Sequence, residues 1–328
     1  MKKRLRSYGV NLGAVVLLFV VVTLLTSTGV INKYMAGILL PVCINVILAV
    51  SLNLTTGMLG QLALGHAGFM GVGAYTAALI SLNAKGVWPQ AVSFPLALLA
   101  GGLVAAVFGV IIGIPALRLK GDYLAIITLG FGEIIRVIIN NLAFTGGAKG
   151  MRGIPRLTTF PYVYVLMALV VAVMFTLGRS RHGRAILSIR EDPVAAEAAG
   201  IPTTYYKIFA FALAAFFAGV AGGLYAHYVS SIAPKDFGFT RSIEILVMVV
   251  LGGMGSITGA VGAAVVLTAL PEVLRDFSDY RMLVYSLLLI VMMLFRPSGL
   301  MGTAEFSLTG CIDRLTRRAP RRVDSADK

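Results

Sequence analysis

Few side chains in this sequence could support acid–base, metal or nucleotide chemistry, and those few are scattered. The three histidines are His66, His182 and His227, and none lies at the Cys/His spacing of a zinc site. The chain also lacks GxxxxGK[ST], the loop that cradles nucleotide phosphates. We therefore expect no catalytic residues, no bound metal, no cofactor and no ATP site of that kind in this chain.

Two opposite charges lie within an apolar stretch. Glu133 and Arg136 are three residues apart in GFGEIIRVIIN, so they can pair along one face of a helix. Ionisable residues inside a membrane span are functional candidates, and a mutually neutralised structural pair is the alternative. The sequence shows no relay of buried carboxylates beside them, which argues against a proton-coupled carrier.

A glycine-rich stretch, GMLGQLALGHAGFMGVGAY at residues 57–75, interrupts apolar surroundings. Glycine permits backbone turns that other residues resist, and a broken helix can expose backbone groups to a cavity. A second interruption, GGMGS, divides the apolar run 242–270. Close helix packing is the alternative for the glycines, and a satisfied bundle histidine is the alternative for His66. The candidate residues of a substrate path are Asn53, Gln61, Gly65, His66, Gly68, Phe69, Tyr75, Gly253 and Gly255.

The composition requires most of the chain to be membrane-embedded. Of its 328 residues 58% are hydrophobic and only 13% are charged. Apolar runs long enough for helical spans recur throughout, at 10–31, 35–54, 67–80, 91–114, 122–141, 160–178, 207–228, 242–270 and 282–295. The net charge of +14 is distributed between these runs and at the ends, which is typical of cytoplasmic loops and argues against a nucleic-acid-binding surface.

The run 242–270 decides the predicted topology. If it is a helical hairpin broken at Gly252–Gly255, roughly twice as many Lys and Arg residues lie on the cytoplasmic side as outside. A single crossing would distribute them evenly. We therefore predict an all-α, polytopic inner-membrane bundle of about ten helical segments, broken or re-entrant at 55–75 and 242–270, with both termini cytoplasmic. Residues 1–302 form the transmembrane domain, and residues 303–328 form a basic cytoplasmic tail.

The longest basic loop, residues 179–206, contains a compact helix signal. Asp192 is a good N-cap, Pro193 suits the first helical position, and Gly200 suits the C-terminal stop. The intervening PVAAEAA spans about two turns, or about 10 Å. It lacks the large apolar anchors of a helix that lies on a membrane, so it is predicted to dock into a groove of a partner. The docking residues are Arg184, Arg190, Glu191, Asp192, Ala195, Ala196, Glu197, Ala198, Ala199 and Gly200.

At this loop the sequence resembles the permeases of ABC importers. REDPVAAEAAGI looks like their coupling segment, while SLNLTTGMLGQLALGHAGFMGVGAYTAALI, LKGDYLAIITLGFGEIIRVIINN and GGMGSITGAVGAA resemble permeases of branched-chain amino-acid importers of the LivM type. The resemblance covers roughly residues 35–302. In the coupling segment Glu197, Ala198, Ala199 and Gly200 match the family's acidic residue, small pair and glycine. Here the glycine follows the small pair directly, whereas the motif of better-known importer families places it several residues later.

The resemblance implies a machine of five parts. Two related permeases form the pathway, two cytoplasmic ATPases bind ATP and Mg²⁺, and a periplasmic binding protein delivers the substrate. The wider family also includes permeases for urea and short amides, so these remain alternatives. Two further alternatives remain. One is an ion-coupled carrier, which the broken helices favour, and the other is a structural or assembly protein, which would also use the projecting loop.

Overall fold

The computed structural model describes residues 33–84, 88–116, 119 and 121–274, together with short pieces among residues 13–28 and 280–305. These residues are almost entirely helical, and within them the only β-ladder joins β1 (Met151–Arg152) antiparallel to β2 (Ser231–Ile232). The predicted all-α class is confirmed. Residues 1–12 and 306–328 lie outside the described residues, so the cytoplasmic position of both termini stays a prediction.

Four of the described helices are long and apolar enough to cross a membrane. They are α2 (Lys33–Asn53) with the following π-helix η1 (Leu54–Met58), α4 (Gln90–Ala116), α6 (Phe160–Arg179) and α9 (Thr203–Val229). Helix α5 (Asp122–Asn141) also has the predicted bounds, whereas α3 (His66–Asn83) is longer than predicted at each end. The predicted spans 10–31 and 282–295 fall largely outside the described residues.

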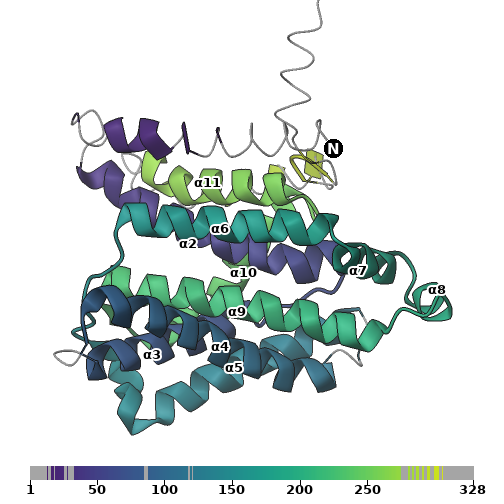
Figure 1. Ribbon diagram of the computed structural model, residues 1–328, viewed down its shortest axis with the longest axis horizontal. Coiled ribbons are helices and arrows are strands. Elements are labelled where there is room, and N and C mark those ends of the chain that lie inside the picture. Colours follow the sequence, from purple (N-terminus) through teal and green to yellow (C-terminus); the bar gives the residue numbers. More distant parts are fainter. Residues whose placement is uncertain are drawn as a thin grey trace, which may run out of the picture.

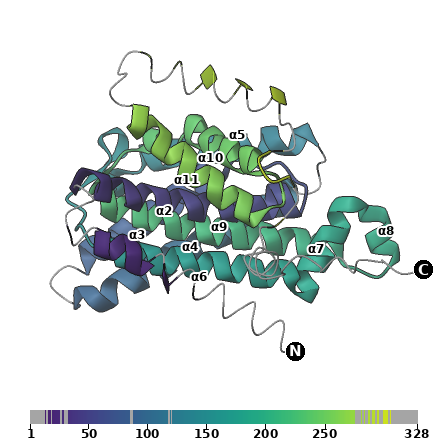
Figure 2. The same ribbon diagram turned by 90° about the horizontal axis from the view of Figure 1, so that it is seen from above.

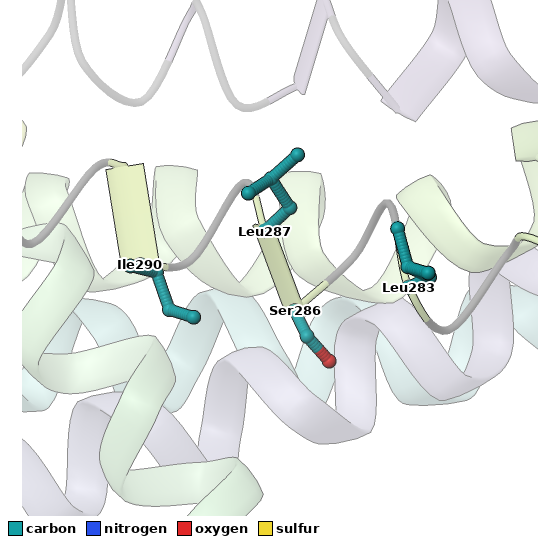
Figure 3. Close-up of a pocket in the computed structure, with 4 residues that line it drawn as sticks. All are labelled: Leu283, Ser286, Leu287 and Ile290. Carbon is teal, nitrogen blue, oxygen red and sulfur yellow. The ribbon is translucent and has the colours of Figure 1, made fainter.

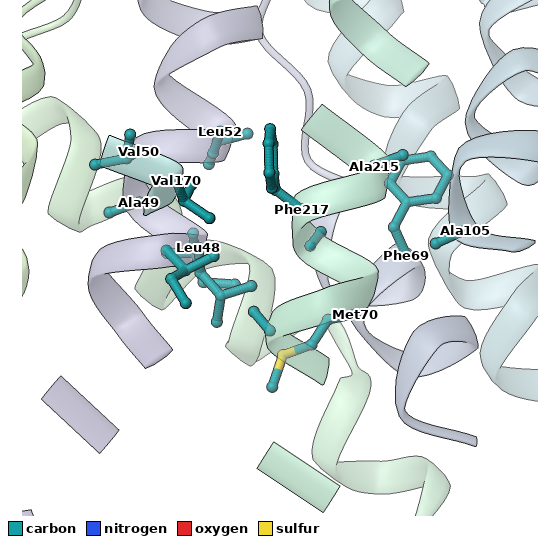
Figure 4. Packing of buried hydrophobic residues seen from close by; sticks show 14 of the residues in the cluster. Leu48, Ala49, Val50, Leu52, Phe69, Met70, Ala105, Val170, Ala215 and Phe217 are labelled. Atoms are coloured by element: carbon teal, nitrogen blue, oxygen red, sulfur yellow. The ribbon is translucent and has the colours of Figure 1, made fainter. Parts of the chain in front are cut away.

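Helix α2 is the centre of the molecule. Every residue from Val42 to Leu59 is buried, because α6, α9, α10 (Phe239–Gly252) and α11 (Ile257–Val273) all pack against α2 or η1. A helix that is apolar on all sides is stable only where protein or lipid surrounds it. Leu48 of α2, Val170 of α6 and Phe217 of α9 are among the side chains packed here (Figure 4).

Glycines bring a second group of helices, α3, α4 and α9, into backbone contact. A Cβ atom on Gly73 of α3 would lie 2.2 Å from the Cα of Gly219 in α9. A Cβ atom on Gly101 of α4 would lie 2.7 Å from the carbonyl oxygen of Gly73. Small residues at helix interfaces permit the close approach that membrane bundles rely on. Figure 1 shows these helices below α2 and α11 above it, while α6 crosses in front of α2.

Both predicted interruptions are present. The first is narrower than predicted, because only residues 59–65 lack helical structure and α3 begins at His66. The second separates α10 from α11 by a turn at residues 253–256, in which Gly253 and Gly255 have φ angles of 110° and 98°. Gly252 and Gly259 touch through their backbones, so the two helices form the predicted hairpin.

The basic loop forms two helices, α7 (Arg181–Glu191) and α8 (Pro193–Ala198). They extend beyond one end of the bundle in both views (Figures 1 and 2). Helix α9 follows α8 and is 27 residues long, which corresponds to about 40 Å. The short elements η2 (Ala143–Thr145), η3 (Gly147–Lys149) and η4 (Pro234–Phe237) and the β-ladder therefore lie toward the opposite end.

Candidate coupling and transport site

Helix α8 has the ends that its sequence predicts. The Asp192 carboxylate accepts hydrogen bonds from the backbone N–H groups of Val194 and Ala195, at 2.8 and 3.1 Å. At the other end Gly200 has a φ of 81°, and its N–H donates to the carbonyl of Glu197 at 2.9 Å. The N–H of Ile201 donates to the carbonyl of Ala196 at 3.0 Å, which completes a Schellman motif.

One face of α8 is anchored and the rest is exposed. Ala196 is buried, and the Thr203 hydroxyl at the start of α9 donates a hydrogen bond to the Glu197 carboxylate. Val194 is 70% exposed, and Ala195, Ala198 and Ala199 are exposed beside it. Short side chains on a helix fixed at both ends make a slim, preorganised surface that a partner's groove can enclose.

Arg190, in the last turn of α7, points back into the bundle. Its Nη1 donates to the carbonyl oxygen of Gly57 in η1, at 2.8 Å. A Cβ atom on Gly60 would lie 2.9 Å from Cγ of Arg190, and one on Gly255 would lie 2.9 Å from its Nη1. The sequence predicted a role for Arg190 in docking, and the structure places it against both broken segments.

Asn53, at the end of α2, joins the same two segments. Its Oδ1 accepts from the N–H of Gly255 at 2.9 Å, and its Nδ2 donates to the carbonyl of Ser256 at 3.0 Å. We call this meeting point the junction and define it as Asn53, Gly57, Arg190, Gly255 and Ser256. Of the candidate path residues, it contains Asn53 and Gly255.

A segment near the C-terminal end of the described chain also contacts the hairpin. Leu300 N–H donates to the carbonyl of Leu251 at 2.7 Å. The Glu305 carboxylate accepts from the N–H groups of Ile257 and Thr258, at 2.7 and 3.1 Å. A carboxylate at this position stabilises the N-terminus of α11. Sequence reasoning missed this contact, because a single Glu in a polar tail carries no signal of its partner.

The other candidate path residues are mostly packed among helices. His66 is buried, with its Nε2 2.9 Å from the Ser51 hydroxyl. Cβ atoms on Gly65 and Gly68 would lie 2.3 Å from the Thr128 carbonyl oxygen and 2.9 Å from Gly132 Cα. Phe69 packs edge-on against Phe211, and Tyr75 packs edge-on against Phe237. Within the described part of the chain, Gln61 Oε1 and the Tyr75 hydroxyl are buried without a hydrogen-bond partner.

The Glu133–Arg136 pair forms as predicted, with Arg136 Nε 2.6 Å from Glu133 Oε2. Each side chain is about one-third exposed. The other oxygen of Glu133 accepts from the N–H of Phe239 at 3.1 Å, so this carboxylate also stabilises the start of α10.

A second ion pair lies within α10 itself. Arg241 Nη1 is 2.8 Å from the Glu244 carboxylate, and its Nη2 donates to Asn45 Oδ1 of α2 at 2.6 Å. Asn45 in turn donates to the Thr268 hydroxyl of α11 at 2.9 Å. Charged and polar groups therefore join the first turn of α10 to α5 and to α2.

The surface also has an apolar hollow of about 480 Å³, lined by Leu283, Ser286, Leu287 and Ile290 (Figure 3). These residues recur at helical spacing and include none of the candidate path residues. Aliphatic side chains and one hydroxyl cannot neutralise the two charges of an amino acid. The described residues that line this hollow therefore do not by themselves supply the chemistry of an amino-acid site.

An almost entirely helical, apolar bundle with two interrupted helical segments and a capped helix pair projecting from one end is the architecture of a multi-pass membrane protein. The chain belongs to the family described as branched-chain amino acid transport system / permease component, whose model matches residues 34–295.

Curated relatives agree with this assignment. The chain is 39% identical over 294 residues to the high-affinity branched-chain amino acid transport system permease protein LivM of Salmonella typhimurium, covering 79% of this chain and 68% of that protein. It is 38% identical to LivM of Escherichia coli K12, with the same coverage. Identity to the LivH permease of the same Escherichia coli strain is 30% over 165 residues, about half of each chain. No solved structure shows a significant match.

Proposed function

We propose that this chain is the membrane-spanning permease subunit of an ATP-driven importer in the bacterial inner membrane. It moves leucine, isoleucine, valine or related amino acids from the periplasm to the cytoplasm. The observation that carries this proposal is α8, a helix capped at both ends and exposed beyond the bundle, in a chain of this transport family. ATP and Mg²⁺ bind to partner ATPases, and this subunit itself is not an enzyme.

The proposed assembly contains a second, related permease. Support comes from the relatives, because the chain is similar to both LivM and LivH, and more similar to LivM. Two ATPase subunits dock at the α7–α8 end from the cytoplasm. A periplasmic binding protein delivers the substrate at the opposite end, where the β-ladder lies.

Transport follows from a difference in contacts between two states. When ATP closes the ATPase pair, the docked α8 helices move with it, and the two permeases change their relative positions. A partner can shift such an equilibrium only through contacts that differ between the states. Because α8 is rigidly capped and joined to α9 through Glu197 and Thr203, its displacement reaches the bundle without being lost in a flexible loop.

Reversal of the charge on α8 tests the docking step. In Glu197→Lys the bond to Thr203 is lost and the exposed face changes sign, so we expect the ATPase that copurifies with the permease, and leucine uptake, to fall about tenfold, equivalent to about 1.4 kcal/mol. Asp122→Lys, at the exposed start of α5, is the matched control. Undiminished uptake by Glu197→Lys would contradict docking through α8.

The alternatives predict different results in the same assay. Uptake driven by a proton or sodium gradient without ATP would indicate an ion-coupled carrier. ATP-dependent uptake of labelled urea or acetamide, with none of leucine, would indicate the amide branch of the family. A structural or assembly protein would show no uptake under either condition.

A further inference from the structure

We propose that Arg190 transmits the movement of the α7–α8 pair to both broken helices at once. This inference rests on the proposed function, since it concerns how the docked ATPase acts on the permease. It gives Arg190 a positioning role inside the permease, separate from any contact with the ATPase.

The position of Arg190 in the chain suits this role. It lies two residues before Asp192, the N-cap of α8, at the point where α7 ends and the docking helix begins. Its guanidinium reaches Gly57 of η1, 133 residues away in sequence, through a hydrogen bond of 2.8 Å. A movement of α8 therefore has a second route into the bundle through this side chain, beside the Glu197–Thr203 contact with α9.

The two broken segments are shaped around this side chain. Gly60 and Gly255 have φ angles of 73° and 98°, a conformation that L side chains rarely adopt. Cβ atoms at these positions would press on Cγ and Nη1 of Arg190, respectively. One glycine from each interruption thus lacks the side chain that would otherwise occupy the space of the arginine. The Arg190 side chain therefore contacts both interrupted segments.

Asn53 ensures that the two segments move together. Its two hydrogen bonds connect the end of α2 to the turn between α10 and α11. Ser256 in that turn accepts from the N–H of Gly259 and thereby caps α11. A displacement of η1 by Arg190 is consequently passed to the first turn of α11.

The contact is also suited to being made and broken. Charge-assisted hydrogen bonds are stronger than neutral ones. Among the described residues, no carboxylate lies within 4.0 Å of the Arg190 guanidinium. Its release therefore leaves no buried anion unpaired, and the guanidinium, at the edge of the bundle, can return to water. The cost of release falls on the buried Gly57 carbonyl, so the Arg190–Gly57 bond can differ between the two transport states where water or another donor replaces the guanidinium.

The test measures leucine transported per ATP hydrolysed by the complete transporter, with its binding protein, in proteoliposomes. In Arg190→Ala we expect the complex to assemble and to hydrolyse ATP, while this ratio falls about tenfold, as loss of one charge-assisted bond allows. Arg190→Lys keeps a charged donor without the planar fork, so an intermediate ratio is expected. Arg181→Ala, at the exposed start of α7, is the matched control and retains the ratio of the unchanged protein.

The outcomes separate this inference from the proposed function. If the unchanged permease neither binds an ATPase nor transports leucine with ATP, the proposed function fails. If it does both, and Arg190→Ala keeps the full ratio, only the transmitting role of Arg190 is overturned. Should Arg190→Ala fail to assemble, Arg190→Lys decides: a reduced ratio supports the role, and an unchanged ratio excludes it.

Discussion

The side-chain amide of Asn53 joins the two breaks in the helical bundle, accepting a hydrogen bond from Gly255, 202 residues further along the chain. Asn53 is 1% exposed, and its Nδ2 bonds to the neighbouring Ser256 carbonyl. One buried side chain therefore satisfies both a backbone donor and a backbone acceptor of a turn. Buried backbone groups that lose such partners destabilise the folded state.

Asn53→Ala should lower the free energy of unfolding by about 1–3 kcal/mol, because the Gly255 N–H and Ser256 carbonyl lose their partner. The measurement is thermal unfolding of the purified permease in detergent. Asn141→Ala is the control, since the Asn141 amide is exposed and donates to the carbonyl of Val137 in its own helix. Equal midpoints for the two variants would show that Asn53 does not hold the turn.

The N-cap of α8 gives a second prediction. Asp192→Ala removes the acceptor for Val194 and Ala195 N–H and should cost about 1 kcal/mol of helix stability. Asp192→Asn preserves an acceptor and should behave like the unchanged protein. Amide hydrogen exchange in the full-length permease measures the difference, with faster exchange at residues 194–196 expected only for Asp192→Ala. Identical exchange in both variants would mean that the cap does not stabilise α8.

A substitution can decide whether the glycines of the first interruption serve helix packing or the substrate path. In Gly65→Ala the new Cβ atom would lie 2.3 Å from the Thr128 carbonyl oxygen of α5, so we expect a loss of roughly 1–3 kcal/mol and poor assembly. Gly130→Ala is the control, since no atom of another described segment lies within 4 Å of a Cβ atom there. Size-exclusion chromatography and unfolding measurements report the result. Normal assembly with abolished uptake would instead assign Gly65 to the substrate path.

The Glu133–Arg136 pair can be tested by comparing a single with a double substitution. Glu133→Gln leaves Arg136 without its counter-charge and, because each side chain is about one-third exposed, should destabilise the permease by about 1 kcal/mol. The double variant Glu133→Gln, Arg136→Gln should recover part of this loss, because neither charge remains unpaired. Unfolding midpoints and leucine uptake are both measured. If the double variant recovers stability but does not take up leucine, the pair contacts the substrate. If it retains uptake, the pair is structural.

Local chemistry explains what could be predicted from sequence. The caps of α8 depend only on Asp192, Pro193 and Gly200, which act within one or two turns of the chain, and all three occupy the predicted positions. The hairpin at 242–270 was predicted from charge balance, which reports on the bilayer rather than on any contact. The extent of the first break was overestimated, because glycines that pack against α5 and α9 have the same sequence signature as glycines that turn the chain.

By itself, then, the sequence determined the class of protein, the approximate bounds of the spans among the described residues, the two interruptions and the capped helix, because hydropathy, charge and capping are properties of neighbouring residues. Only the tertiary structure decided what the interruptions meet. It brought Gly57 and Gly255 together around Arg190 and Asn53, and it showed that the side chain of Arg190, predicted as a docking residue, contacts the bundle. Such contacts depend on the relative placement of helices distant in sequence, which no periodicity within one helix encodes.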